Sequence, residues 1–307
     1  MDVGFGPSNY GRAQGNKRNT VIRNDAQQKI DETLTCRAHP LPIFVISYNR
    51  GDTLSRVVDS YRKQARPVEI IIHDNGSNDL ATLAVLDEFA GSGVKVYRRP
   101  PINLKGELNL INETVADYFR VWGEPSRYVV TDCDIDLSIA SPDALALYDE
   151  LLDRFRTVAC VGPMLRISDI RQTYALFNHV MNRHIDHFWR KEPTLAQTSL
   201  GQIAFIEAPI DTTFALHRAG EPFQRLQQGL RVYFPYEARH LEWYHDADKL
   251  NHYHETSSSN ISHWNNKSYY ELKRKEELLF PEYKIVDKDI DGRLIVSLKN
   301  PAVDNPA

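Results

Sequence analysis

The chain has 307 residues, of which 42% are hydrophobic and 25% charged, a composition typical of a globular protein with a sizeable core. Its formal net charge of -4 argues against a nucleic-acid partner, because such a surface needs clustered lysine and arginine. Its three cysteines fit neither a disulfide framework nor a CxxC zinc site, and no apolar run approaches the roughly 20 residues of a membrane span. We therefore expect a cytoplasmic protein without a membrane-crossing segment or signal peptide, with peripheral membrane association left open.

The first 138 residues divide into a polar extension and an alternation of strands and helices. Residues 1–38 are rich in Gly, Asn, Arg and Gln and lack sustained apolar periodicity, which predicts a flexible N-terminal extension. Beyond them, short apolar runs predict buried strands, and apolar residues spaced three or four apart predict helices. The expected strands are 42–47, 68–72, 94–97 and 128–131, and the expected helices are 54–61, 80–89 and 108–119.

This alternation predicts an α/β fold, in which a mostly parallel sheet carries helices on both faces and binds ligands at the carboxyl ends of its strands. We expect residues 39–307 to form one domain, with a ligand-binding half at 39–138 and a second half at 139–307. The elements expected in the second half are a helix at 142–155 and β structure at 158–161, 203–206 and 212–216.

Residues 241–270 have a different composition from the rest of the chain. They are dense in His, Asn, Ser, Trp and Tyr, which predicts a ligand-facing loop rather than a core segment. With His252, His254 and His263, this stretch is expected to form a C-terminal lid that orders when a ligand binds and excludes water.

The strongest local motif is Asp132-Cys133-Asp134, which directly follows the expected strand at 128–131. Two carboxylates one residue apart on a tight turn are able to face one divalent cation, and oxygen ligands suit Mg²⁺ or Mn²⁺. The pattern alone is common in surface turns. Its position after a buried strand makes it more specific, because acids crowded together need a cation or hydrogen-bond donors nearby. Asp136 is either a third ligand or a cap of the next segment.

Two more polar loops follow buried strands. The first loop contains Ser47, Tyr48, Asn49 and Arg50, and the second contains Asp74, Asn75 and Ser77. Such residues are typical of turns and helix N-caps, whereas an Asp at a strand end is also able to accept the N–H of uracil or bind a ribose hydroxyl; both interpretations stay open here. Since the carboxyl ends of parallel strands meet at one edge of a sheet, we expect both loops to lie beside the Asp132–Asp134 motif.

In this order, the three motifs resemble those of the GT-A glycosyltransferases, in particular family 2. Residues 44–50 resemble the motif that cradles the nucleotide base, residues 69–79 the motif with the base-contacting acid, here Asp74, and residues 128–136 the DxD motif. The resemblance implies a GT-A fold, a nucleotide-diphosphate sugar donor, most often uridine-linked, and a Mn²⁺ or Mg²⁺ ion held by Asp132 and Asp134. It also implies that the donor is bound by Ser47, Tyr48, Asn49, Arg50, Asp74, Asn75, Ser77, Asp132 and Cys133.

An inverting enzyme of this kind needs a carboxylate that deprotonates the acceptor hydroxyl. Asp211 precedes an expected strand that resembles the one flanking the donor sugar in this fold. Glu237 lies where family 2 enzymes often carry their acidic base, although the Glu-Asp pair of that motif is absent. A turn-capping Asp and a solvated helical Glu are the structural alternatives. Inversion is preferred, and retention stays open because retaining members need no comparable base.

Histidines in the second half offer further metal ligands. His240 and His245 are candidates for the ligand that many GT-A enzymes draw from the C-terminal part of the chain, although a histidine beside Trp and Tyr is more often packed than metal-bound. His184 and His187 are neighbours on a helix. They and His179 lack the HExxH pattern, and we interpret them as part of a polar, aromatic helix at an acceptor cleft and not as metal ligands.

These motifs predict the transfer of a sugar to a hydroxyl group of a glycan, a lipid-linked molecule or another small acceptor. A sugar-phosphate nucleotidyltransferase also has an α/β sheet and metal-binding acids, but its first strand should lead into a glycine-rich basic loop, and residues 47–52 contain one glycine. A protein that binds a nucleotide or glycan without turnover is the alternative from another class.

Overall fold

The computed structural model describes residues 39–100, 110–122, 124–256, 267–279, 284–286 and 297–299. The chain divides into two units, Met1–Pro40 and Leu41–Ala307. The extension expected at 1–38 lies outside the described residues, as does His263.

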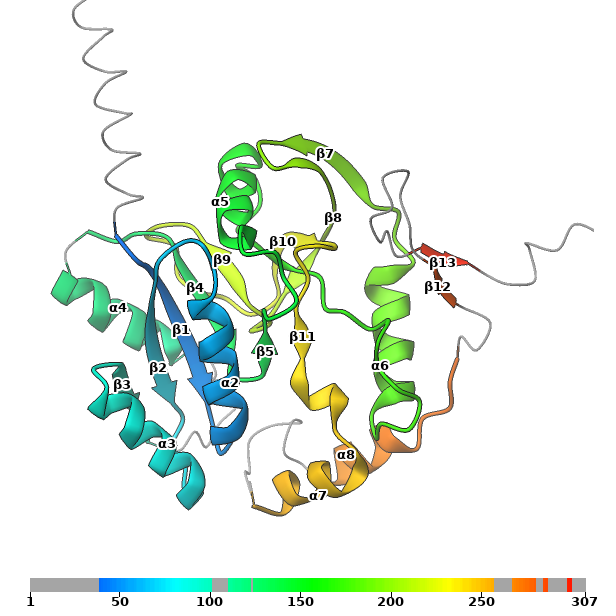
Figure 1. Cartoon of the computed structure of the whole chain (residues 1–307), viewed down its shortest axis with the longest axis horizontal. Coiled ribbons are helices and arrows are strands. Elements are labelled where there is room, and N and C mark those ends of the chain that lie inside the picture. Colours follow the sequence, from blue (N-terminus) through cyan, green and yellow to red (C-terminus); the bar gives the residue numbers. More distant parts are fainter. Residues whose placement is uncertain are drawn as a thin grey trace, which may run out of the picture. The chain divides into compact units, whose positions relative to one another are not determined.

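Strands and helices alternate through the first part of the second unit, as the sequence predicts (Figure 1). In chain order they are β1 (Leu41–Ser47), α2 (Gly51–Arg62), β2 (Val68–Asp74), α3 (Leu80–Gly91), β3 (Lys95–Arg98), α4 (Ile111–Trp122) and β4 (Tyr128–Asp132). Local chemistry explains where α3 begins. The carboxylate of Asp79 accepts a hydrogen bond from the backbone N–H of Thr82 at 2.8 Å, which satisfies one of the N–H groups left unpaired at a helix start.

The rest of the chain adds further strands, four α-helices and two short helical turns among the described residues. These elements are β5 (Ile135–Asp136), α5 (Ala144–Arg154), β6 (Cys160–Pro163), α6 (Phe177–His184), the π-helical turn η2 (Ile185–Trp189), β7 (Thr194–Thr198), β8 (Gly201–Ile210), β9 (Ala215–His217), β10 (Gln227–Val232), β11 (Arg239–His240), the 3-10 turn η3 (Leu241–Tyr244), α7 (Ala247–Thr256), α8 (Lys267–Arg274), β12 (Lys284–Val286) and β13 (Ser297–Lys299). No described helix is long and apolar enough to cross a membrane.

The expectation of a loop at 241–270 is wrong for the part of this stretch that the structure describes. Residues 241–244, 247–256 and 267–270 are helical. Leu241, Trp243 and Leu250 are buried, so a few apolar side chains anchor a segment whose overall composition is polar. Burial of such side chains in a tertiary core overrides the polar composition of their neighbours.

A nine-stranded sheet in the order β3-β2-β1-β4-β9-β6-β10-β8-β7 forms the centre of the second unit. The strands from β3 to β4 are parallel, whereas β9 is antiparallel to both of its neighbours. Beyond β9, β6 and β10 are parallel and β8 and β7 are antiparallel. The α/β fold class is therefore confirmed, with a parallel first half and a mixed second half.

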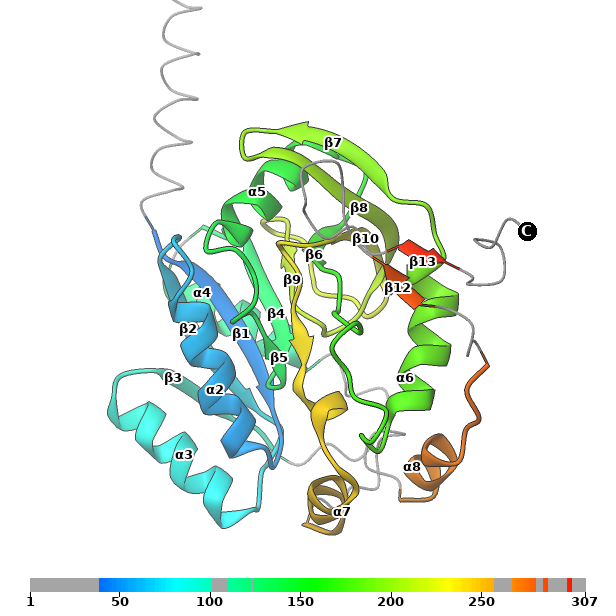
Figure 2. The ribbon, with the colours of Figure 1, turned by 45° about the vertical axis from the view of Figure 1, so that its right-hand side comes forward.

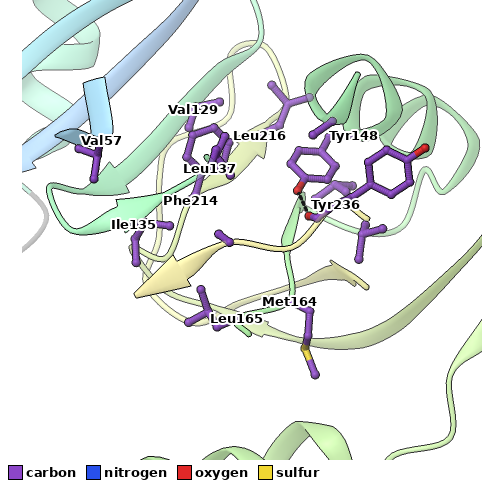
Figure 3. Packing of buried hydrophobic residues seen from close by; sticks show 14 of the residues in the cluster. Val57, Val129, Ile135, Leu137, Tyr148, Met164, Leu165, Phe214, Leu216 and Tyr236 are labelled. Carbon is purple, nitrogen blue, oxygen red and sulfur yellow. Dashed lines mark hydrogen bonds between the residues drawn. The ribbon is translucent and has the colours of Figure 1, made fainter. Parts of the chain in front are cut away.

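Alternate side chains of β1 pack into separate clusters on the two faces of the sheet. Ile43 and Val45 belong to the larger cluster with residues of α2 and α5, and Phe44 belongs to a smaller cluster with residues of α4. Figure 3 shows part of the larger cluster, in which the hydroxyl of Tyr148 donates a hydrogen bond to the backbone carbonyl of Tyr236 at 2.6 Å. Because both faces are packed, the strand ends are held in fixed positions from which the loops begin.

Candidate active site at the carboxyl ends of the parallel strands

The ends of β1, β2 and β4 lie beside one another at one edge of the sheet (Figure 2). In the parallel register Ser47 pairs with Asp74, and Ile46 pairs with Asp132. The three loops that the sequence predicted to converge therefore start side by side. Their positions follow from strand order, because β1 lies between β2 and β4.

Asn49 ties the first loop to the second. Its side-chain oxygen accepts hydrogen bonds from the backbone N–H groups of Asn78 at 2.8 Å and Asp79 at 3.0 Å, and its side-chain N–H₂ donates to Asn78 at 2.8 Å. Its backbone has a φ of 48°, a left-handed conformation that Asn adopts more easily than most residues. The Asn49 side chain thus shapes the loop pair through contacts within the protein.

Asp74 is the last residue of β2, directly before the second loop, and is buried. Both of its carboxylate oxygens accept hydrogen bonds from Ser77, one from the backbone N–H at 2.9 Å and one from the hydroxyl. Burial raises the pKa of Asp74, and the Ser77 hydrogen bonds oppose this shift. The half-buried side chain of Tyr48 lies close enough for the Asp74 charge to contribute to a raised Tyr48 pKa, although burial is the larger cause.

A chain of hydrogen bonds positions Asn75. The Nδ1 atom of His73 lies 2.8 Å from the Thr114 hydroxyl, and its Nε2 atom lies 3.0 Å from the Asn75 side-chain oxygen. Arg99 donates to the same Thr114 oxygen at 2.9 Å. Burial lowers the pKa of His73 to about 4, so the ring is neutral near pH 7, and its Nε2–H donates to Asn75 while Nδ1 accepts from Thr114.

Asp132 is held by the connection between β8 and β9. Its carboxylate accepts a hydrogen bond from the Thr212 hydroxyl, and its backbone N–H donates to the Thr212 carbonyl at 2.7 Å. Burial raises the pKa of Asp132, and the nearby charges of Asp134 and Asp211 raise it further. Three acidic side chains from two segments are thus brought together at this point.

Asp134 faces two basic groups. The Arg50 guanidinium donates to its Oδ2 atom, and the His240 Nδ1 atom lies 3.8 Å from the same oxygen. Arg50 also donates to Glu242 at 2.6 Å. His240 reaches this position because β11 pairs with β5, with His240 opposite Ile135. Asp134 and His240, which the sequence predicted as metal ligands, therefore lie close together although they come from distant parts of the chain.

Unpaired polar atoms concentrate at this edge. Among the described residues, eight buried side-chain polar atoms make no hydrogen bond, and buried polar groups of this kind call for an explanation. Five of the eight belong to the strand-end loops and the segments that face them, namely Ser47 Oγ, Asp134 Oδ1, Asp211 Oδ1, Thr213 Oγ1 and His240 Nδ1. No group of three or more His, Cys, Asp or Glu side chains is arranged to hold a metal ion in the part of the chain that the structure describes.

The two candidate bases have different surroundings. Asp211 forms an ion pair with Arg225 through Oδ2, its Oδ1 has no hydrogen-bond partner, and its charge acts on Asp132. Glu237 is 1% exposed and accepts hydrogen bonds from Arg166 at 2.9 Å and from the backbone N–H of Phe234 at 3.1 Å. The geometry therefore favours Asp211 as the general base, because both carboxylate oxygens of Glu237 already accept hydrogen bonds from the protein.

Two of the candidate histidines, His240 and His184, pack against Trp243. The His240 ring stacks on Trp243 with centroids 4.6 Å apart, and the His184 ring contacts the same indole at 4.4 Å. Burial lowers the pKa of His184 well below its usual value. His245 lies near Arg50 and Lys249; burial, followed by these charges, lowers its pKa to about 4.

Cys133 and Asp136, which belong to the same motif as Asp132 and Asp134, point into the protein. The Cys133 side chain belongs to the larger apolar cluster, and burial raises the pKa of its thiol. The carboxylate of Asp136 accepts hydrogen bonds from Arg56 at 2.8 Å and from the Ser138 backbone N–H at 2.8 Å. Of the two interpretations of Asp136, the structure shows the contacts of a cap on the next segment.

A cavity of about 510 Å³ lies between α6 with η2 and the residues that follow α8. Asn182 joins its two walls, because its side chain donates to the Glu277 carbonyl at 2.8 Å and accepts from the Leu279 N–H at 2.7 Å. His179 contacts the Glu276 carboxylate at 2.8 Å. The lining residues are His179, Asn182, Arg183, Asp186, His187, Glu276 and Leu279.

Three residues that contact the candidate site were not expected from the sequence, namely Thr212, Glu242 and Arg225. They lie next to expected residues or pair with them, yet none follows an apolar strand in a recognisable motif. Adjacency to Asp211 and His240 was the available signal for Thr212 and Glu242.

Residues 43–117 match the model of glycosyl transferase family 2. The match confirms the resemblance to family 2 that the motifs predicted, over the part of the chain that carries Ser47, Asn49 and Asp74. A comparison with curated proteins found no match.

Several solved structures are similar to parts of the chain. Mannosyltransferase PcManGT from Pyrobaculum calidifontis, in complex with GDP-Man and Mn²⁺, is 20% identical over 42% of this chain and 36% of its own, with a TM-score of 0.33. Glucosyl-3-phosphoglycerate synthase from Mycobacterium tuberculosis, in complex with Mn²⁺ and UDP-glucose, is 18% identical over 62% and 60%, with a TM-score of 0.35. S. aureus TarS 1-349 is 14% identical over 58% and 47%, with a TM-score of 0.35. The chain thus spans less than two thirds of each of these proteins.

Proposed function

We propose that this chain is a glycosyltransferase that moves a sugar from a nucleotide-diphosphate donor, with UDP preferred, to a hydroxyl group, assisted by a divalent cation. The observation that carries the proposal is the set of five unpaired buried polar atoms at the strand ends, next to loops that match glycosyl transferase family 2. Unpaired buried groups are costly unless a ligand completes their hydrogen bonds. A polar donor would supply the missing partners.

The loops after β1 and β2 would bind the nucleotide. Asp74 and Ser47 lie opposite each other in the register of the sheet, and Asp74 is fixed by Ser77, so its carboxylate is oriented to accept a hydrogen bond from the base or the ribose. Asn49 and Asn75 keep the two loops in place through the contacts described above. Tyr48 borders Asp74 and would cover the base.

The residues near Asp134 fit a divalent cation. Its Oδ1 atom and the Nδ1 atom of His240 are both buried and without a hydrogen-bond partner, and carboxylate and imidazole both bind Mn²⁺. We assign Asp134 and His240 as the protein ligands, with Asp132 beside them, and keep His245 as a further candidate. Diphosphate oxygens would complete the shell, and the cation would stabilise the charge of the departing nucleotide diphosphate.

Asp211 is our choice for the general base of an inverting transfer. Arg225 holds one carboxylate oxygen, which leaves the unpaired Oδ1 atom to accept the proton of the acceptor hydroxyl. Thr212, the next residue, is bonded to Asp132, so Asp211 is placed at the edge of the donor site. A base there would take the proton as the hydroxyl oxygen attacks the sugar.

We place the acceptor in the cavity beside α6. His184 on α6 contacts Trp243, which stacks on His240, so the helix that lines the cavity also borders the donor site. Arg183 is exposed in this cavity and makes no hydrogen bond or ion pair with the described residues, whereas Asp186 is paired with Arg190 at 2.9 Å. An unpaired guanidinium suits an acceptor that carries a phosphate or carboxylate group; glycan and lipid-linked acceptors both offer such groups.

A screen of nucleotide sugars tests this function. Metal-dependent transfer or hydrolysis should occur with at least one nucleotide sugar in the wild type and should be lost in Asp134→Ala, because the cation then lacks its carboxylate. Ser138→Ala is a matched control near the same loop. Activity that survives Asp134→Ala would refute the assignment of the cation site. Nucleotide binding without any transfer would favour the non-catalytic alternative, and analysis of the product's anomeric configuration separates inversion from retention.

A further inference from the structure

Arg50 joins two acidic side chains that come from distant segments. It follows the loop after β1 and precedes the first turn of α2. One guanidinium nitrogen donates to Asp134 after β4, and the other donates to Glu242 in η3 at 2.6 Å. The three side chains are 15%, 2% and 10% exposed, respectively. A guanidinium that donates to two carboxylates in such surroundings compensates charges that would otherwise be costly to bury.

The same Asp134 carboxylate is the proposed ligand of the divalent cation. Arg50 and His240 both approach its Oδ2 atom, and its Oδ1 atom has no hydrogen-bond partner. A divalent cation bound by Asp134 and His240 would lie within a few ångströms of the guanidinium. Two positive charges at such a short distance repel each other strongly where water is largely excluded. In this arrangement Asp134 is therefore able to bind either Arg50 or the metal ion, but not both.

Glu242 provides a second anchor for Arg50. It lies two residues after His240, in the turn that begins at Leu241. If the contact with Asp134 breaks, the contact with Glu242 still keeps the guanidinium at the edge of the site. There it would be able to donate to the diphosphate oxygens of a bound donor, because the planar fork of a guanidinium matches two oxygens of a phosphate group.

We propose that Arg50 is an exchangeable counter-cation: it holds Asp134 while the site is empty, leaves Asp134 when the metal ion binds, and then binds the donor diphosphate while anchored by Glu242. This inference rests on the proposed function. Its consequence is that metal and donor bind cooperatively, because the metal ion must displace Arg50 and the donor stabilises the displaced Arg50. By linkage, each ligand increases the affinity of the other by the same factor.

Mn²⁺ binding, measured from the electron paramagnetic resonance signal of the free ion, tests the exchange without an activity assay. Without nucleotide, Arg50→Met should bind Mn²⁺ about tenfold more tightly than the wild type, because no guanidinium competes for Asp134. With UDP present, the wild type should gain Mn²⁺ affinity and Arg50→Met should gain less. Arg62→Met, an exposed arginine on the same helix, should behave like the wild type in both conditions.

Arg50→Lys keeps the test decisive if Arg50→Met does not fold, as circular dichroism will show. Lysine is a point charge without a planar fork and should bridge Asp134 and Glu242 less well, so its Mn²⁺ affinity without nucleotide should exceed that of the wild type. Equal or weaker Mn²⁺ binding by the folded Arg50 variants, with wild-type binding of Mn²⁺ and UDP intact, would overturn the exchange alone. Failure of the wild type to bind Mn²⁺ even with UDP would overturn the exchange together with the proposed cation.

Discussion

The hydroxyl of Thr212 donates a hydrogen bond to the carboxylate of Asp132 across 80 positions of sequence. A second contact between the same residues, from the Asp132 N–H to the Thr212 carbonyl at 2.7 Å, fixes the start of the segment before β9 against the end of β4. Thr212 is buried, and the half-buried Asp132 lies beside Asp134 and Asp211. Thr212 therefore links the proposed donor and base residues.

We predict that Thr212→Val lowers the free energy of unfolding by about 1–3 kcal/mol, because the half-buried carboxylate of Asp132 loses its hydroxyl donor while the backbone contact stays. Urea unfolding at pH 7.5 measures this change. Thr212→Ser keeps the donor and should lose much less stability. A valine variant as stable as the serine variant would show that the hydroxyl does not support Asp132.

We predict that Asp211→Asn lowers mainly kcat, whereas Glu237→Gln lowers mainly stability. Asp211→Asn should lower kcat by about 10²–10⁴ at nearly unchanged stability, because it removes a general base. Glu237→Gln should cost about 3 kcal/mol of stability, since it leaves the partly buried Arg166 without its charge partner. Steady-state kinetics and urea unfolding of both variants separate the roles. A large loss of kcat in folded Glu237→Gln, with Asp211→Asn active, would reverse the assignment.

We predict that His73 makes stability depend on pH. Its pKa is about 4 in the folded chain against an ordinary value of 6.5, so the unfolded state binds more protons between these values. The contribution is present in full above pH 6.5 and is lost as the pH falls toward 4. At pH 5 the loss is on the order of 2 kcal/mol.

His73→Gln should remove that part of the pH dependence, because glutamine carries no titratable proton. Urea unfolding of the wild type and the variant at pH 7.5 and pH 5 measures the difference. Other buried histidines and the acids titrate in both proteins and cancel in the comparison. Equal pH dependence of the two proteins would show that His73 is protonated as easily in the folded chain as in the unfolded one.

We predict that Arg183→Gln raises KM for an acceptor with a phosphate or carboxylate group by about 10-fold or more, with little change in kcat, because a hydrogen bond to a charged group is lost. Phosphorylated, carboxylated and neutral acceptors should be compared in the transfer assay. Neutral acceptors should be unaffected. Arg156→Gln removes another exposed arginine and should match the wild type with all three classes. An equal effect on neutral acceptors would show that Arg183 recognises no anionic group.

Much of the donor half could be predicted because its signals are local. A short apolar run is enough to indicate β1 or β2, and the polar residues after it, such as Asn49 and Asp74, mark the strand end. The sequence could not tell whether Asn49 faces a ligand or the neighbouring loop, because its partners Asn78 and Asp79 are about 30 positions away. That choice depends on how two loops pack.

The stretch at 241–270 shows why composition failed there. Its polar residues outnumber its apolar ones, but Leu241, Trp243 and Leu250 pack into the core, and residues 241–244, 247–256 and 267–270 are helical. The few buried residues decide the position of the segment. Hydrophobic burial is a tertiary gain that composition alone does not reveal.

The sequence by itself determined the α/β alternation, the order of the three strand-end motifs and the identity of the acids at each strand end, because these follow from short-range periodicity and chain order. Only the tertiary structure decided which groups face those acids. Arg50 meets Glu242 across 192 positions, Thr212 meets Asp132 across 80, and His240 comes opposite Ile135 through the pairing of β11 with β5. Such contacts arise when distant segments bury charge together, and no local pattern encodes the partner of a buried charge.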